Sequence, residues 1–282
     1  MTDLNSTTER AALLEGFVEA AREAGAAIWD IFQQDFTVVT KADSSPVTAA
    51  DTAAEAIILQ ALARLLPDVP VVAEEEVAAG RMPEVGDRFL LVDPLDGTKE
   101  FIRKGTDFTV NIALVEHGAP TLGVVYAPAR SRLFAGDVKA SLAWTAEIGP
   151  EDASPLGERR PLRVRPLGPA LAAVASKSHD TPETEAYLKA CGVAERVSIG
   201  SSLKFCLVAA GEADLYPRAG PTCEWDTGAG HAVLVAAGGR VFDLSGAPLP
   251  YGKARFFNPG FVATGPYEAP PLGPFMGGAP TA

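Results

Sequence analysis

The chain of 282 residues is long enough for one large domain or two fused ones, and its 47% apolar and 21% charged residues indicate a packed core rather than a disordered chain. Its 24 basic and 36 acidic residues give a net charge of −12. This excess of acid excludes a general nucleic-acid-binding protein, because phosphate backbones require a basic surface. A small phosphorylated substrate stays compatible, since a few local cations or bound metal ions can hold it.

Cysteine usage and hydropathy bear on the cellular compartment. The chain has 3 cysteines, too few and too odd in number for a disulfide framework, and its N-terminal segment lacks the apolar core of a secretory signal. The longest apolar run is far shorter than the ~20 residues that span a bilayer. We therefore expect a cytoplasmic protein without a transmembrane segment. Peripheral association with the inner membrane stays open, as does the choice between a monomer and a homodimer.

The first half of the chain reads as two helices followed by strands. Apolar residues at helical spacing predict helices over residues 7–32 and 48–66, and Ser6 with Glu9 is a capping-box pattern for the first. Short β-rich segments separated by Gly and Pro follow, at residues 71–73, 88–93, 108–115, 122–127 and 132–135. This order predicts an α+β domain over residues 1–150.

Residues 149–169 are rich in Pro, Gly and charge and read as a boundary. Beyond them, strands and helices alternate, which predicts an α/β domain over residues 151–282. The predicted strands are at residues 171–175, 196–199, 213–216 and 240–242, and the predicted helices are at residues 181–191, 202–210 and 227–237.

The segment LVDPLDGTKEF, residues 91–101, is the sharpest motif in the chain. A buried strand ends at Asp93, a proline then prevents further ladder pairing, and Gly97 permits a tight turn. We therefore expect Asp93 and Asp96 close together, with the backbone amides of Gly97 and Thr98 available to an anion. An ordinary Asp-Pro or Asp-Gly turn is the structural alternative. The spacing excludes an EF-hand.

Two further acidic residues lie at the ends of predicted elements. Glu74 follows a short apolar strand, where a solvated turn is the alternative, and Asp226 precedes an apolar helix, where capping is the alternative. Were all four carboxylates to converge, each pair ~4 Å apart would repel by roughly 4 kcal/mol at an effective dielectric near 20. Such a cluster needs protonation or cations. Oxygen ligands without His or Cys favour Mg²⁺ or Mn²⁺, and two such ions suit phosphate ester hydrolysis by an activated water.

These motifs resemble those of the Mg²⁺-dependent, lithium-sensitive inositol monophosphatase-like phosphatases. DPLDGT, the upstream Glu74-Glu75 and the downstream Trp225-Asp226 occur in the same order. Three longer stretches resemble the 3'(2'),5'-bisphosphate nucleotidases of the CysQ type: DPLDGTKEFIRKGTDFTVNIALVEHG, GSSLKFCLVAAGEADLYPR and WDTGAGHAVLVAAGG. The resemblance implies a layered αβαβα sandwich of the inositol monophosphatase and fructose-1,6-bisphosphatase type. It also implies Mg²⁺-dependent hydrolysis of 3'-phosphoadenosine 5'-phosphate to AMP and phosphate, in sulfur metabolism.

The resemblance also assigns roles to the acidic motifs. It implies two metal ions, or three, held by the Leu95 carbonyl and by four carboxylates: Glu74, Asp93, Asp96 and Asp226. Thr98 and Asp51 correspond to the pair that orients or deprotonates the attacking water, with Glu74 as a further catalytic group. For Asp51 the alternative is an exposed acid favoured by the helix dipole. The expected contacts with the substrate around the cleaved phosphate are Glu74, Asp96, Gly97, Thr98, Lys99 and Asp226.

The resemblance places the phosphate that is not cleaved on Ser201, Lys204 and Arg218, and an Arg fork suits such an oxyanion. Lys204 lies in an apolar run, so its alternative is a lysine that snorkels from a helix edge. His179 corresponds to a position near the nucleoside, and an ordinary loop histidine is its alternative. Lys41, on a loop, would fit a lid over the phosphate.

Two rival functions remain open on the sequence alone. The first is an inositol or sugar phosphate monophosphatase of the same fold. The second is a regulatory protein that binds metals or anions without catalysis.

Overall fold

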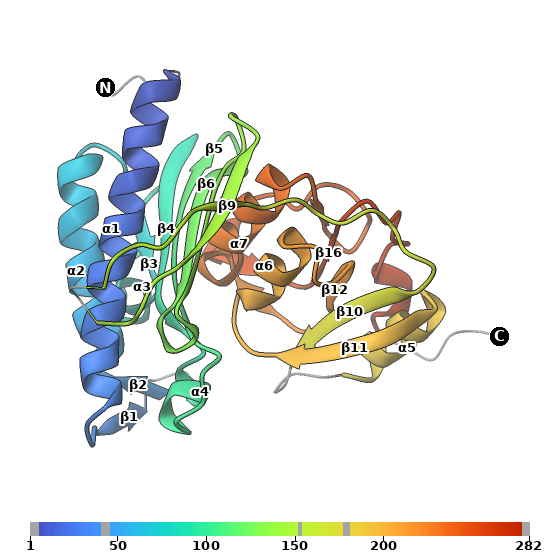
Figure 1. Ribbon diagram of the computed structural model, residues 1–282, viewed down its shortest axis with the longest axis horizontal. Coiled ribbons are helices and arrows are strands. Elements are labelled where there is room, and N and C mark those ends of the chain that lie inside the picture. The colour runs from blue at the N-terminus through green and yellow to red at the C-terminus, as the bar shows by residue number, and fades with distance from the viewer. Residues whose placement is uncertain (1–5, 41–45, 152–153, 177–180, 278–282) are drawn as a thin grey trace.

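The computed structural model describes residues 6–40, 46–151, 154–176 and 181–277. These residues form five layers in the order α–β–α–β–α (Figure 1). Helices α1 (Thr7–Phe32) and α2 (Ala49–Leu65) cover one face of a seven-stranded sheet. Helices α6 (Leu203–Ala209) and α7 (Glu224–Ala236) lie between this sheet and a five-stranded one, and α5 (Pro182–Ala190) packs on the far side. The predicted layered sandwich is thus confirmed.

The seven-stranded sheet supplies the framework for most of the acidic motifs. Its first strand pairs parallel to the second, and the other neighbours pair antiparallel. In spatial order the strands are β3 (Val71–Ala73), β4 (Arg88–Asp96), β5 (Thr109–Glu116), β6 (Ala119–Ala127), β7 (Arg132–Asp137), β8 (Leu142–Glu147) and β9 (Arg160–Pro161).

The five-stranded sheet is mixed. Strand β10 pairs parallel to β11 and β12, whereas β16 pairs antiparallel to β12 and β14. In spatial order the strands are β11 (Val193–Ile199), β10 (Leu171–Ser176), β12 (Leu215–Arg218), β16 (Phe261–Thr264) and β14 (Arg240–Phe242). Two small ribbons pair β1 (Val38–Thr40) with β2 (Pro46–Thr48) and β13 (Thr222–Cys223) with β15 (Phe257–Asn258).

Three expectations about local structure are wrong. Strand β4 continues past the proline to Asp96, with a register shift after Asp93, because a bulge lets Asp96 rejoin the ladder opposite Thr109. Ser6 is the residue before α1 but makes no side-chain cap. Helix α7 begins at Glu224 rather than at residue 227, so Asp226 lies inside its first turn.

Helix α7 sits in the middle layer because two glycines let it approach the first sheet. A Cβ on Gly123 would lie 2.4 Å from the Ala229 carbonyl oxygen, and one on Gly136 would lie 2.8 Å from the Val233 Cα. A larger residue at either of these two positions would force the helix away from the sheet. The predicted division of the chain into two domains at residue 150 stays a prediction. Two elements that follow residue 150 in sequence join the first half: β9 is the last strand of the seven-stranded sheet, and α7 packs on that sheet.

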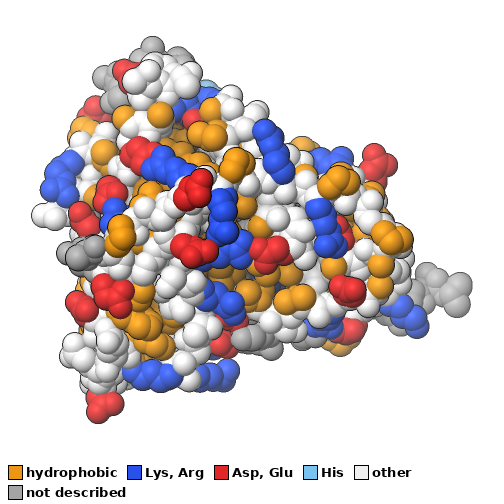
Figure 2. Space-filling model, viewed as in Figure 1, with side chains coloured by type: hydrophobic (Ala, Val, Ile, Leu, Met, Phe, Trp, Pro, Cys, Tyr) orange, Lys and Arg blue, Asp and Glu red, His pale blue; other side chains and the backbone are white. Residues whose placement is uncertain are grey.

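Hydropathy and surface charge complete the outline of the molecule. Within the described ranges, no helix is long and apolar enough to cross a membrane. Figure 2 shows Lys and Arg interspersed with Asp and Glu over one face. Exposed ion pairs such as Arg159–Glu15 and Arg160–Glu147 contribute little to stability, because water screens them.

A buried ion cluster ties α1 to the sheet. The Arg10 guanidinium donates to Glu116 at 2.9 Å and to Asp137 at 2.8 Å, and the Arg10 side chain is 3% exposed. Burial by itself would raise the pKa of Glu116. Hydrogen bonds from Thr121, Lys139 and Arg10 outweigh it and lower the pKa from 4.5 to about 2. The ionised form of Glu116 therefore stabilises the fold.

This cluster predicts a pH-dependent stability. A carboxyl whose pKa is depressed on folding stabilises above its unfolded pKa, so the contribution of Glu116 should be full above pH 4.5 and lost towards pH 2. Glu116→Gln should lower the free energy of unfolding near pH 7 by about 3 kcal/mol. Urea unfolding at several pH values measures this, and the difference from wild type should shrink below pH 4.5. A difference that is independent of pH would contradict the assignment.

Candidate active site

The last residues of β4, directly before the turn into α4 (Thr98–Ile102), present the first group of acidic side chains. Asp93 is 1% exposed, and its Oδ1 accepts a hydrogen bond from the Leu95 backbone amide at 3.0 Å. The bulge places Asp96 one step further along, where its Oδ2 accepts from the Ser202 amide at 2.6 Å. Gly97, at φ 97°, makes the left-handed turn into α4, a conformation that favours glycine.

Three separate elements bring further acids towards this turn. Glu74 opens α3 (Glu74–Ala78) directly after β3, whose last residue Ala73 pairs with Val92 of β4. Asp226 lies in the first turn of α7, and its Oδ2 accepts from the Cys223 amide at 2.8 Å. Its predicted capping role is therefore present in the structure. Asp51 caps α2 in the same way, through hydrogen bonds from the Thr48 amide and hydroxyl, both 2.8 Å long.

One cavity of about 320 Å³ joins these segments. Its walls include the side chains of Glu74, Asp93, Asp96 and Asp226, the Leu95 residue, and the turn formed by Gly97 and Thr98. The lining of this cavity also includes Lys99, Ser201, Lys204 and Arg218. Thus the sequence motifs, which lie as far as 152 positions apart, face a common space.

Burial and mutual repulsion raise the pKa of the central carboxyls. The pKa of Asp93 is well above its usual value because of burial and of the charges of Glu74, Asp96 and Asp226. The pKa of Asp226 is raised by burial and by Asp96 and Glu74. Burial raises the pKa of Asp96 to about 6, although Lys204 and the Ser202 amide act in the opposite direction. The cluster thus stores repulsion that a cation would relieve.

The donor set fits a hard divalent cation. It consists of carboxylate oxygens and a nearby backbone carbonyl, the ligands that Mg²⁺ prefers. Hydrogen bonds engage one oxygen each of Asp93, Asp96 and Asp226, and among the described residues the second oxygen of each accepts none. The acidic side chains line one cavity but do not converge closely enough to coordinate one ion: in the described ranges, no three His, Cys, Asp or Glu residues form a metal-ligand group. Small side-chain rotations would have to complete the site.

Thr98 and Asp51 are in direct contact at the edge of the cavity. The Thr98 hydroxyl lies 3.1 Å from both the Asp51 Oδ1 and the Leu95 carbonyl oxygen, and it can donate to either. Burial raises the pKa of Asp51, and the hydrogen bonds from Thr48 oppose that effect. Because Asp51 is 2% exposed, the alternative of an exposed helix acid is wrong.

Lys204 and Arg218 make part of the cavity lining cationic, and this part is called the cationic wall. Lys204 is 4% exposed, and its ammonium donates to the Ser201 carbonyl at 2.5 Å and to the Ile199 carbonyl at 3.3 Å. The snorkelling alternative is therefore wrong. Burial lowers the pKa of Lys204 to about 8. Arg218, at the end of β12, donates to the carbonyls of Gly220 and Pro221 at 3.2 and 3.1 Å, which orients its guanidinium.

Some expectations fall elsewhere. His179 and Lys41 lie outside the described residues. Lys99 is exposed at the rim. The cavity is also lined by residues that the sequence analysis missed: Glu100, Ser202, Phe205, Tyr216 and Thr227. The only signal for them in the sequence was their position inside the stretches that resemble the family.

Comparisons with known proteins agree with this architecture. The model of the inositol monophosphatase family matches residues 9–266. A relative from Escherichia coli (strain K12), called 3'(2'),5'-bisphosphate nucleotidase CysQ, is 48% identical over 252 residues, which cover 88% of this chain and 98% of the relative. Another protein of that name, from Haemophilus influenzae, is 32% identical over 90% of this chain and 93% of its own length.

Solved structures give the same result. The crystal structure of CysQ from Bacteroides thetaiotaomicron superposes with a TM-score of 0.74 at 36% identity, covering 91% of this chain and 98% of that one. Inositol monophosphatase from Anabaena superposes with a TM-score of 0.69 at 26% identity, covering 94% and 99%. The matched residues include every segment that lines the acidic cavity, and the chain belongs to the inositol monophosphatase family.

Proposed function

We propose that the protein is a 3'(2'),5'-bisphosphate nucleotidase that hydrolyses 3'-phosphoadenosine 5'-phosphate to AMP and phosphate. The observation that carries this proposal is the lining of one cavity, in which an acidic wall of four carboxylates is joined by a cationic wall, the oriented cations Lys204 and Arg218. A substrate with two phosphates matches both walls. The names of the relatives at 48% and 36% identity support the same activity.

The acidic wall is the proposed site for two Mg²⁺ ions, or three, with Mn²⁺ as a substitute. Glu74, Asp93, Asp96, Asp226 and the Leu95 carbonyl would hold them. When bound, such ions neutralise the carboxylates, polarise a phosphoryl group and lower the pKa of water.

The chain itself would bind and orient the reacting groups. The backbone amides of Gly97 and Thr98, which lie at the start of α4 and line the cavity, would donate to the phosphoryl oxygens of the cleaved group. The Thr98 hydroxyl, held 3.1 Å from Asp51, would accept a hydrogen bond from the attacking water while it donates its own proton to that carboxylate. Asp51 can take the proton, since burial raises its pKa.

The cationic wall separates this proposal from its rival. Inositol 1-phosphate carries a single phosphate group, so it would offer no second phosphate to the buried Lys204 and the oriented Arg218. Both cations gain a charge-assisted partner from the 5'-phosphate of a nucleotide. This favours the nucleotidase over an inositol or sugar phosphate monophosphatase. The names of the relatives argue against a non-catalytic regulator. Cytoplasmic location and a monomeric or dimeric state stay predictions.

Divalent ions should stabilise the fold. Saturating Mg²⁺, at about 100 times its Kd, should raise the Tm of the wild type by roughly 5 °C. Asp226→Asn removes one of the repelling charges, so the metal-free variant should be at least as stable as the wild type and should lose most of the rise. Scanning fluorimetry measures both effects. Asp30→Asn, an exposed acid on α1, is the control and should keep the rise. Equal rises in both variants would contradict the metal site.

Substrate preference tests the function directly. With Mg²⁺, phosphate release from 3'-phosphoadenosine 5'-phosphate should exceed release from inositol 1-phosphate by at least about tenfold in kcat/KM, because only the substrate with two phosphates engages both cavity walls. Initial rates over this panel provide the measurement. Inositol 1-phosphate turned over equally well would refute the nucleotidase assignment and support the rival.

Substitutions on the two walls should change different kinetic parameters. Arg218→Ala should raise KM for the bisphosphate by roughly tenfold or more and leave KM for adenosine 3'-monophosphate within about threefold, since only the former has a 5'-phosphate. Thr98→Ala should lower kcat for both substrates by roughly a hundredfold, whereas Thr98→Ser should retain most activity. Steady-state kinetics on both substrates separates these patterns. Arg218→Ala acting equally on both substrates would remove the second-phosphate role.

A further inference from the structure

The turn of residues 200–202 carries Ser201 and leads into α6, which carries Lys204, and this turn is attached to the first sheet. The Ser202 hydroxyl lies 2.9 Å from the Thr109 hydroxyl and 2.6 Å from the Asn111 side-chain oxygen, both on β5. Its backbone amide donates to Asp96. Ser201 has a φ of 52°, which is uncommon for a residue with a Cβ, so the turn needs external support.

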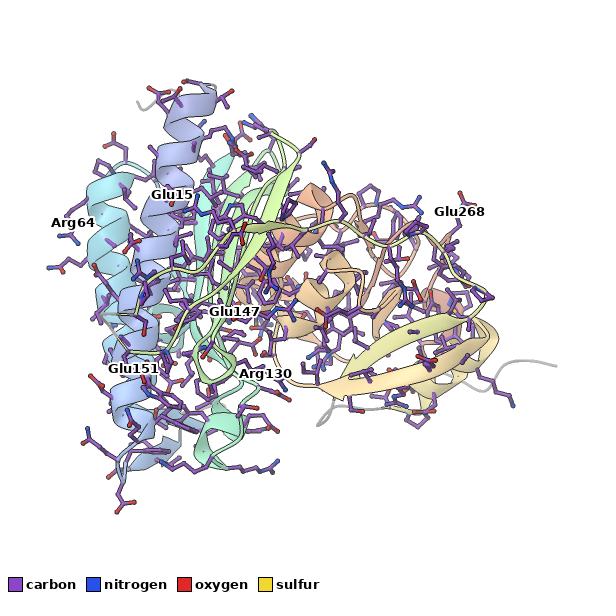
Figure 3. All side chains as sticks on the ribbon, in the orientation of Figure 1. Glu15, Arg64, Arg130, Glu147, Glu151 and Glu268 are labelled. Carbon is purple, nitrogen blue, oxygen red and sulfur yellow. The ribbon has the colours of Figure 1, made fainter. Side chains whose placement is uncertain are left out.

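A buried carboxylate provides part of that support. Asp107, just before β5, is 0% exposed, and its Oδ2 accepts from the Gly200 amide at 3.1 Å. Its Oδ1 accepts from the Arg130 guanidinium, from Nε at 2.8 Å and from Nη2. Arg130 ends the short helix η1 (Pro128–Arg130) after β6, and in Figure 3 it lies on the side of the first sheet that faces β11. One carboxylate thus links the sheet to the turn.

The backbone of Asp107 is also wedged between the two anion-binding segments. A Cβ added to Gly97 would lie 2.7 Å from the Asp107 carbonyl oxygen. A Cβ added to Gly200 would lie 2.7 Å from the Asp107 Cβ and 2.9 Å from the same carbonyl oxygen. Gly97 belongs to the loop proposed for the cleaved phosphate, and Gly200 begins the turn proposed for the other one. Asp107 therefore separates the two segments by direct contact.

We propose that Asp107, held by Arg130, is a positioning residue that fixes the spacing between the two anion-binding segments and so selects substrates with two phosphates. This inference rests on the proposed function. Its cause is geometric: Asp107 sets where the Gly200–Ser202 turn stands, and the turn sets where Ser201 and Lys204 meet the second phosphate. The Asp107 side chain bonds the turn, whereas Gly97 meets the Asp107 backbone carbonyl, so binding of the cleaved phosphate should depend on that side chain much less.

A second ion pair supplies the matched control. Arg132 of β7 donates to Glu212, which follows α6, at 2.6 Å. This pair ties the first sheet to the segment after α6, just as the Asp107–Gly200 hydrogen bond ties the segment before β5 to the turn, and neither Arg132 nor Glu212 is among the residues that line the cavity. A general loosening between the first sheet and the α6 region would affect both the Asp107–Gly200 hydrogen bond and the Arg132–Glu212 pair, whereas positioning of the turn would depend only on Asp107 and Arg130.

The test compares Asp107→Asn, Arg130→Gln, Arg130→Lys and Arg132→Gln on two substrates. An asparagine has one accepting oxygen and cannot accept from Arg130 and Gly200 at separate atoms as Asp107 does. Asp107→Asn should raise KM for 3'-phosphoadenosine 5'-phosphate by roughly tenfold and change KM and kcat for adenosine 3'-monophosphate by less than about threefold. Arg130→Gln should act in the same direction, Arg130→Lys should restore part of the loss, and Arg132→Gln should match the wild type.

Calorimetric binding of AMP, which carries only the 5'-phosphate, gives a second readout independent of turnover. Asp107→Asn and Arg130→Gln should weaken it by a similar factor. Equal losses on both substrates, or unchanged AMP binding, would overturn the positioning role. If Asp107→Asn does not fold, the Arg130 variants decide, since the Arg130 side chain is 39% exposed. Wild-type protein that binds AMP but does not cleave the bisphosphate would refute the proposed function and not the positioning role.

Discussion

Electrostatic repulsion inside one cavity is the constraint on which the structure of the site depends. Four carboxylates line one cavity. The pKa values of Asp93, Asp96 and Asp226 are raised by burial and by the charges of the neighbouring carboxylates. Left to themselves, such groups would turn towards water. Backbone hydrogen bonds prevent this: the amides of Leu95, Ser202 and Cys223 each hold one oxygen of an acid in place. The fold thus maintains an arrangement that favours bound cations.

The energy for this arrangement comes from packing away from the site. Helix α7 approaches β6 and β7 at Gly123 and Gly136 so closely that its first turn, with Asp226, is delivered to the end of β4. The buried Arg10 cluster fixes α1 on the opposite face of the same sheet. The sheet between them is then rigid where the β4 bulge brings Asp96 beside Asp93. Packing on both faces of the sheet therefore stabilises the edge where the mutually repelling carboxylates lie.

Local patterns in the sequence predicted much of this. Helical spacing located α1 and α2, and the acidic motifs predicted carboxylates that the structure places in one cavity. The bulge in β4 was missed because proline argues for the end of a strand, whereas a shifted register lets Asp96 pair again. The contact of Asp107 with Arg130 and Gly200 was missed for another reason. It joins residues 23 and 93 positions apart, and such distant pairs leave no periodicity or spacing to detect.

Anomalous diffraction from crystals soaked in Mn²⁺ tests the central claim most directly. If the carboxylates form a divalent-ion site, anomalous peaks should lie between Glu74, Asp93, Asp96 and Asp226, with at least one within coordinating distance, about 2.2 Å, of two of these side chains. The same crystals soaked without Mn²⁺ should give no peaks there. Ordered Mn²⁺ found only elsewhere on the molecule, with this cavity free of anomalous signal at millimolar Mn²⁺, would contradict the account.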